Sequence, residues 1–228
     1  MIDEKLLKKF PKNQVDEAIK LLTYHNAPEL PKEESDILPT MYIFRHGQSE
    51  DNAEFIFSGW RDPGLTQKGI EQAEVLAEKI KDKKLQMLIS SPQKRAIETM
   101  KIAISKNPYA KKLEITTDDR IKERSYGELQ GKSKLLAQLE NPKLLETERR
   151  SFDYVLKGGE SIEMVCKRVA DFCDSIIPII KETGVNVAIS CHGNSIRGFR
   201  RYFEKLSDAE TASIETPLAQ DYAAYIIK

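Results

Sequence analysis

From residue 41 onward, short apolar runs alternate with segments whose apolar residues recur every three or four positions. The run 85–89 has the length and composition of a buried strand, whereas Ile70, Ala73 and Leu76 share one face of a helix. Strands separated by helical segments predict βαβ units and therefore a mostly parallel sheet. We expect an α/β fold built as a three-layer sandwich, with a mostly parallel central sheet and helices on both of its faces. The expected strands are 41–44, 85–89, 113–117, 185–190 and 222–227.

Local signals predict where several helices begin and end. Thr66 and Ser161 each precede a helical pattern and are expected to cap it. Pro92 is expected at the first position of another helix. Asn141-Pro142 should divide a helical stretch, and Pro178 should kink or end the helix that follows Ser161.

Residues 1–40 differ from the alternating pattern that follows them. Four apolar residues there have helical spacing: Val15, Ala18, Ile19 and Leu22. A polar segment with several prolines follows over 28–39. We expect an N-terminal helical arm and a proline-containing linker over 1–40, packed on the main domain or on a second subunit. The main domain is expected over 41–228.

The composition excludes several classes of protein. The 228 residues carry 36 Lys+Arg and 36 Asp+Glu, and this balance argues against nucleic-acid and membrane-surface binding, which usually need a basic excess. No run approaches the length of a membrane span, and the charged first residues do not resemble a signal peptide. Three cysteines without a CxxC spacing make disulfides and a zinc site unexpected. We therefore expect a cytoplasmic protein.

Two histidines lie in matching contexts, each directly after an apolar run. The two stretches are Arg45-His46-Gly47-Gln48-Ser49 and Cys191-His192-Gly193-Asn194-Ser195. Because the carboxyl ends of parallel strands meet at one edge of a sheet, His46 and His192 should lie close together. Arg95 follows the strand that ends at the same edge, at the start of a helix whose N-terminus favours anions. Together with Arg45, these side chains predict a phosphoryl-binding site.

These residues resemble the histidine phosphatase (phosphoglycerate mutase-like) superfamily, and most closely its cofactor-dependent phosphoglycerate mutases. The resemblance covers essentially all of 41–227 and predicts a catalytic domain of this kind over 41–228. The shared motifs are Arg45-His46-Gly47-Gln48-Ser49-Glu50-x-Asn52, Phe57-Ser58-Gly59-Trp60, Gln93-Lys94-Arg95-Ala96, Glu123-Arg124-x-Tyr126-Gly127 and His192-Gly193-Asn194-Ser195-x-Arg197-Gly198.

The resemblance implies a reaction through a phosphohistidine on His46, without a metal. His192, Arg45 and Arg95 would stabilise the charge of the transferred phosphoryl group, and Glu123 would be the general acid. The residues that the resemblance assigns to substrate binding are Ser49, Asn52, Ser58, Gly59, Arg124, Tyr126, Lys134, Arg149, Arg150, Gly193 and Asn194.

The leading expectation is a mutase of glycolysis and gluconeogenesis that interconverts 3-phosphoglycerate and 2-phosphoglycerate. Its substrate would be a small anionic phosphorylated molecule, and 2,3-bisphosphoglycerate would be its priming phosphate donor. Mutases of this family often form dimers or tetramers, so a homo-oligomer is compatible with the sequence.

The alternative enzyme is a metal-independent histidine phosphatase that hydrolyses a small phosphorylated metabolite. The short connection 153–161 and the end of the chain at Lys228, without the tail that closes many mutase sites, favour it. A third alternative is a non-catalytic protein that recruits a partner through 1–40. The joint presence of the catalytic set weighs against that reading.

Overall fold

The computed structural model describes residues 9–23 and 29–228, so parts of the expected arm and linker lie outside the described residues. Within those ranges, one sheet of five strands has the order β3-β2-β4-β1-β5. Its strands are β1 (Thr40–Arg45), β2 (Leu85–Ser90), β3 (Ile115–Thr117), β4 (Asn186–Cys191) and β5 (Ala223–Ile226). All neighbours pair in parallel except β5, which is antiparallel to β1. The expected mostly parallel sheet is confirmed.

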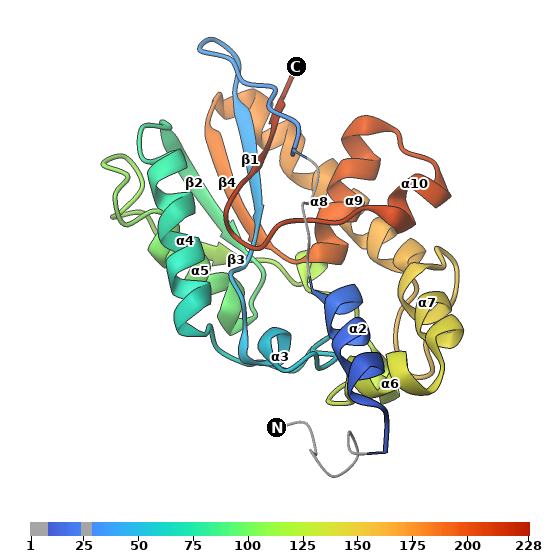
Figure 1. The fold of residues 1–228 in the computed structure, drawn as a ribbon. Helices are drawn as coiled ribbons and strands as arrows, with labels where there is room; N and C mark the ends of the chain where they lie inside the picture. The colour runs from blue at the N-terminus through green and yellow to red at the C-terminus, as the bar shows by residue number, and fades with distance from the viewer. Residues whose placement is uncertain (1–8, 24–28) are drawn as a thin grey trace.

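Helices cover both faces of this sheet (Figure 1). Before the second strand come α2 (Lys12–Leu22), α3 (Glu50–Ala53) and α4 (Gln67–Ile80). The middle of the chain forms α5 (Lys94–Ala103), the short 3₁₀ helices η1 (Asp119–Ile121) and η2 (Gly127–Leu129), α6 (Lys134–Glu140) and α7 (Pro142–Arg150). The last helices are α8 (Ile162–Thr183), α9 (Gly193–Glu204) and α10 (Asp208–Ser213).

The side chains of β1 show how the three layers arise. Met41 and Ile43 belong to the apolar core shared with α8 and α9, while Tyr42 and Phe44 belong to the core shared with α4 and α5. Successive strand residues point to opposite faces, so a strand that is apolar at every position must be covered on both sides. The three-layer α/β sandwich expected from the sequence is therefore confirmed.

The expected helix caps are confirmed, whereas the prediction that Pro92 opens a helix is wrong. The side chains of Thr66 and Ser161 accept hydrogen bonds from backbone N–H groups in the first turns of α4 and α8. Pro92 does not open α5, because Gln93 is still extended and the helix begins at Lys94. Pro178 does not end α8, which continues to Thr183, and the expected alternative of a kink stays a prediction. A proline removes one helical hydrogen bond, and the complete burial of Ile180 beyond it helps to offset that loss.

The helix α2 packs on the main body of its own chain, next to α6 (Figure 1). Its Ala18 and Leu22 join a small apolar cluster with Phe57, Leu135 and Leu145. The linker also contacts the sheet, because backbone hydrogen bonds join residues 31–33 to Ala224 on the outer side of β5. The division of the chain at residue 40 stays a prediction.

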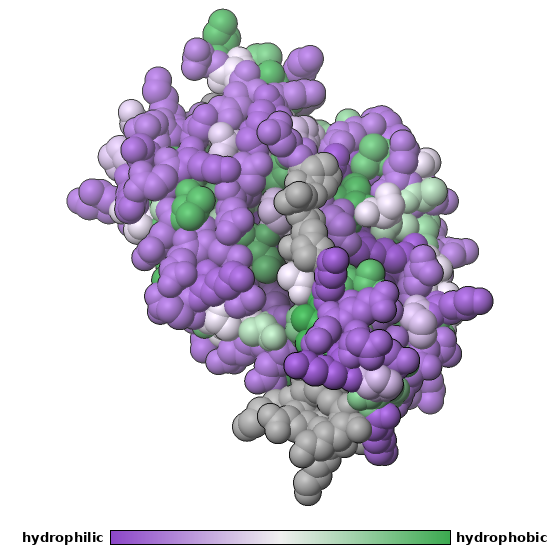
Figure 2. Space-filling model, viewed as in Figure 1, coloured by the Kyte–Doolittle hydropathy of each residue, from purple (hydrophilic) through white to green (hydrophobic). Residues whose placement is uncertain are grey.

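The surface in view is dominated by hydrophilic residues, with apolar residues scattered between them (Figure 2). Among the helices that the structure describes, none is long and apolar enough to cross a membrane.

Candidate active site

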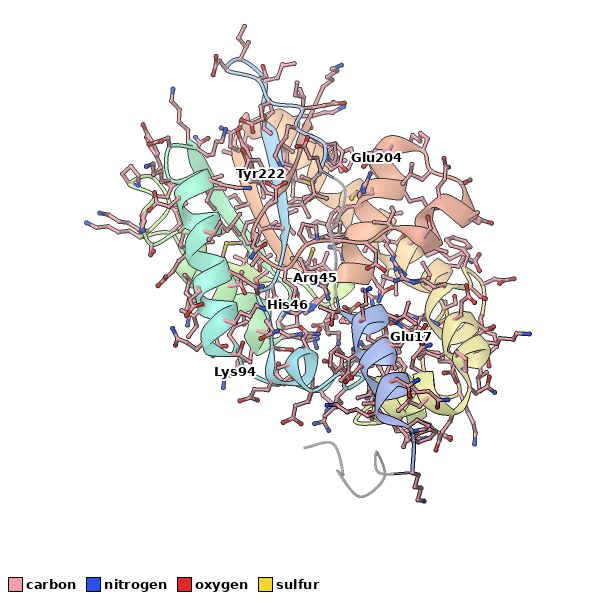
Figure 3. The ribbon with its side chains drawn as sticks, in the orientation of Figure 1. Glu17, Arg45, His46, Lys94, Glu204 and Tyr222 are labelled. Carbon is pink, nitrogen blue, oxygen red and sulfur yellow. The ribbon has the colours of Figure 1, made fainter. Side chains whose placement is uncertain are left out.

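The parallel pairing of β1 and β4 brings the two histidines together. Arg45 is in register with Cys191, so the residues that follow, His46 and His192, leave the sheet side by side. Their ring centroids are 5.0 Å apart. Figure 3 shows Arg45 and His46 where β1 ends, near the middle of the molecule. The expected meeting of the two motifs at one edge of the sheet is found.

Hydrogen bonds orient the imidazole of His46. Its Nδ1 lies 2.6 Å from the carbonyl oxygen of Gly47, which can only accept, so Nδ1 carries the proton. Its Nε2 accepts a hydrogen bond of 3.3 Å from Nε of Arg95. Burial, followed by the positive charges of Arg95 and Arg45, holds the pKa of His46 well below its ordinary value. At neutral pH the ring is therefore uncharged, with its Nε2 lone pair on the side of Arg95.

A close backbone approach holds the loop that carries His46. A Cβ atom on Gly47 would lie 2.3 Å from the carbonyl oxygen of Gly69, in the first turn of α4. The N–H of Gly47 donates to Oγ1 of Thr99 on α5. Glycine is required here because any side chain would push the loop away from α4.

Arg95 is buried against His46 and held by two backbone carbonyl groups. Its Nη1 donates to the oxygen of Arg61 at 2.9 Å, and its Nη2 donates to the oxygen of Gly59 at 3.0 Å. These bonds hold a guanidinium group directly beside Nε2 of His46. A phosphoryl group on that nitrogen would therefore meet a fixed positive charge.

His192 has a buried ring nitrogen that has no hydrogen-bond partner among the described residues. Its Nε2 lies 2.8 Å from Oγ of Ser91, and its Nδ1 is buried without a hydrogen bond. Burial, Arg95 and His46 lower the pKa of His192 well below its ordinary value. If the hydroxyl of Ser91 donates to Nε2, the neutral ring keeps its proton on Nδ1. A buried donor of this kind is suited to an anionic oxygen.

Glu123 is held through both its carboxylate and its backbone. Its Oε1 accepts hydrogen bonds from the backbone N–H of Arg124 and from both the backbone N–H and the side-chain amide of Asn194. Its own N–H donates to Oε1 of Gln93, and its carbonyl oxygen accepts from Arg168. Because Oε1 is engaged three times, Oε2 is the oxygen suited to exchange a proton.

One cavity of about 60 Å³ is lined by His46, Arg95 and Glu123 together. Cationic side chains outnumber carboxylates in its wall, so it suits an anionic ligand. Its lining contains the expected residues Arg45, His46, Asn52, Ser58, Gly59, Arg95, Glu123, Tyr126, Lys134, Arg149, Arg150, Gly193 and Asn194. Among the described residues, no group of three or more His, Cys, Asp and Glu side chains could hold a metal ion.

The structure places two of the residues assigned to substrate binding, Arg124 and Ser49, outside the lining of the cavity. Arg124 is fully buried, and its guanidinium donates to the carbonyl oxygens of three residues: Glu148, Tyr154 and Glu160. It therefore ties α7 to the loop before α8, and it does not line the cavity. Ser49 is also fully buried and caps α3 by accepting from the N–H of Asn52. His192 is not among the residues that line the cavity, although its ring lies beside that of His46.

Several residues of the site were not assigned from the sequence. Arg197, Glu215 and Thr216 line the cavity, and Arg168 holds the segment before Glu123. Arg197 lies inside one of the shared motifs, so the sequence offered a signal for assigning it to the site. No local pattern marks Glu215 or Arg168, which reach the site only through the fold.

Comparison with known proteins identifies the family. A model of the histidine phosphatase superfamily (branch 1) matches residues 41–225. The chain belongs to this superfamily. A 2,3-bisphosphoglycerate-dependent phosphoglycerate mutase of Cytophaga hutchinsonii is 36% identical over 180 residues, which cover 78% of this chain and 83% of the relative. Phosphoglycerate mutase 1 of Saccharomyces cerevisiae is 34% identical over 211 residues, covering 79% and 84%.

Solved structures of histidine phosphatases share the fold. A mycobacterial glucosyl-3-phosphoglycerate phosphatase matches with a TM-score of 0.72 and 22% identity, covering 82% of this chain and 92% of that one. YhfR of Bacillus stearothermophilus also matches with a TM-score of 0.72, at 24% identity, covering 82% and 90%. At these identities the likeness concerns the fold alone.

Proposed function

We propose that this histidine phosphatase is a phosphoglycerate mutase that interconverts 3-phosphoglycerate and 2-phosphoglycerate. The observation that carries the proposal is a second group of cations in the cavity of His46, made of Lys134, Arg149 and Arg150. A phosphate monoester needs only the groups around His46, whereas a phosphoglycerate also carries a carboxylate. The names of relatives more than 30% identical support the same substrate.

In the proposed reaction, Nε2 of His46 attacks the phosphorus atom of the bound phosphate ester. The N–P bond forms as the bond from phosphorus to the ester oxygen breaks, and Glu123 gives its proton to that oxygen. In the return step, Glu123 takes the proton of the acceptor hydroxyl while the phosphoryl group moves from His46 to that oxygen. The priming donor 2,3-bisphosphoglycerate supplies the first phosphoryl group.

Arg45, Arg95 and His192 would stabilise the transferred group. Its three equatorial oxygens spread the negative charge, and fixed donors around them lower the barrier because they need no reorganisation during the reaction. The Nδ1–H of His192, buried without a described partner, is assigned to one of these oxygens.

A second candidate is a phosphatase that acts on a small phosphorylated metabolite. The connection between Arg150 and Ile162 favours it, because residues 151–161 form a short loop without a helix or strand of their own. A mutase must keep water from the phosphohistidine, and a short covering segment gives less protection.

The deciding experiment incubates the purified protein with 3-phosphoglycerate, with and without catalytic 2,3-bisphosphoglycerate. Both 2-phosphoglycerate and inorganic phosphate are followed over time. We expect rapid 2-phosphoglycerate that depends on the bisphosphate, with little free phosphate. Free phosphate with little isomerisation would reject the mutase and favour the phosphatase.

A further inference from the structure

One wall of the catalytic cavity, residues 214–216, is held chiefly by arginines from two different elements, with a longer contact of 3.5 Å from Nη1 of Arg150 to the oxygen of Ile214. Arg45 on β1 donates from Nη1 to the carbonyl oxygen of Thr216 at 2.9 Å. Arg197 on α9 donates from Nη2 and Nε to the oxygen of Ile214, at 2.9 Å and 3.1 Å. Bonds to backbone oxygens fix the path of the loop, so the wall itself has little freedom to move.

The middle residue of this wall, Glu215, places a carboxylate in a cavity otherwise dominated by cations. It forms an ion pair with Nη2 of Arg150, one of the cations assigned to the second anionic group of the substrate. Both side chains keep some exposure, 38% for Glu215 and 25% for Arg150. Glu215 therefore has the charge and the position that a substrate carboxylate would take at Arg150.

We propose that Glu215 is a specificity-determining residue, an internal competitor for the second anion site. The proposal rests on the proposed function, which assigns that site to phosphoglycerates. A ligand with two anionic groups must displace the carboxylate of Glu215 from Arg150, whereas a ligand with one phosphate does not meet it. The displaced side chain can turn toward solvent, because it is already 38% exposed and because Arg45 and Arg197 hold the backbone of the wall at shorter distances than Arg150 does.

The charge of Glu215 should therefore weaken the binding of phosphoglycerates and leave the phosphate pocket unaffected. The ion pair is partly exposed, and such pairs are worth little, so we expect Glu215→Gln to tighten 3-phosphoglycerate by only about three- to tenfold. Inorganic phosphate, which needs only the groups around His46, should change by less than about twofold, because it does not compete for Arg150 and longer-range charge effects are screened by salt.

The experiment measures equilibrium dissociation constants by calorimetry, in a His46→Gln background that prevents turnover. Inorganic phosphate and 3-phosphoglycerate are titrated into the protein with Glu215 intact and with Glu215→Gln, and melting curves check that each variant is folded. Glu215→Ser replaces Glu215→Gln if the latter does not fold. Glu146→Gln is the matched control, because it removes the same charge from an exposed position on α7.

A double-mutant cycle with Arg150→Gln tests the competition directly. If Glu215 acts through Arg150, the tightening by Glu215→Gln should disappear in the Arg150→Gln background. An unchanged dissociation constant for 3-phosphoglycerate, equal tightening of both ligands, or tightening that persists without Arg150 would each overturn the inference. A different result would contradict the proposed function itself. In that case 3-phosphoglycerate would bind no more tightly than phosphate, both with Glu215 intact and in the Glu215→Gln variant.

Discussion

At the scale of single residues, the chemistry depends on which nitrogen of His46 carries the proton. The carbonyl of Gly47 fixes that proton on Nδ1, and burial together with the guanidinium groups nearby keeps a second proton from binding to Nε2. A lone pair on a neutral, oriented ring is what attack on phosphorus requires. The same cations that would stabilise the phosphoryl group also keep the nucleophile uncharged.

His46→Gln should abolish phosphoryl transfer, because the amide cannot replace the attacking lone pair. We expect the turnover rate to fall by at least roughly a thousandfold. Trapping with labelled 3-phosphoglycerate should give an acid-labile phosphate on the wild-type protein and none on the variant. A variant that is folded by its melting curve and still turns over near the wild-type rate would contradict a nucleophilic role for this histidine.

Glu123→Gln should separate substrates by their leaving groups. The amide oxygen can still accept from Asn194, but the side chain no longer supplies a proton. Transfer from an alkyl phosphate such as a phosphoglycerate should slow by roughly 100- to 10,000-fold, whereas p-nitrophenyl phosphate, whose phenolate leaves without a proton, should lose less than about tenfold.

Steady-state rates with both substrates test the prediction for Glu123. Glu128→Gln is the control, since it removes a carboxylate that is 58% exposed and paired with Lys157 outside the cavity. Equal losses on the two substrates in the Glu123 variant would mean that this residue acts by holding the site together.

At the scale of elements, α2 behaves as part of the body of the protein. Its buried face packs against two residues that are next to cavity residues in the sequence. Phe57 comes directly before Ser58, and Leu135 comes directly after Lys134. An arm that packs there supports the loop and helix carrying these cavity residues. The expectation that the arm needs a partner surface is met within this chain.

Leu22→Ala should destabilise the protein far more than Leu21→Ala. Leu22 is 7% exposed and packs in the cluster, while Leu21 beside it on α2 is 65% exposed. We expect the free energy of unfolding to fall by about 2–4 kcal/mol for Leu22→Ala and by less than about 0.5 kcal/mol for Leu21→Ala. Urea denaturation measures both, and equal small effects would mean that α2 does not dock in solution.

At the scale of the whole molecule, the two buried histidines link stability to pH. Burial and neighbouring arginines lower the pKa of both below the ordinary value of 6.5, so the unfolded chain binds protons that the folded protein does not. The free energy of unfolding should be unaffected by them above pH 6.5 and should fall as the pH decreases below it.

Between pH 6.5 and 5.5, His46 and His192 together should cost about 2 kcal/mol of stability. Urea unfolding at pH 7.5, 6.5 and 5.5 measures the loss in the wild type and in the double variant His46→Gln/His192→Gln. The variant should lack this part of the pH dependence. The same slope in both proteins would show that other groups cause it.

The sequence alone determined the layers of the fold and the place of the catalytic centre. Short apolar runs that alternate with segments of three-to-four-residue period report local backbone preference, and they predicted the parallel sheet with helices on both faces. The two histidine motifs each follow a strand, and parallel strands must end at one edge, so the meeting of His46 and His192 followed from local patterns alone.

Only the tertiary structure decided what each charged side chain contacts. Arg124 matches the family motif, yet the fold surrounds it with carbonyl groups 24 to 36 residues away and removes it from the cavity. Glu215 and Arg150, 65 residues apart, meet because the loop after α10 lies against the end of α7. A long charged side chain contacts whichever groups the packing brings near it. A local sequence pattern does not show which distant residues those groups belong to.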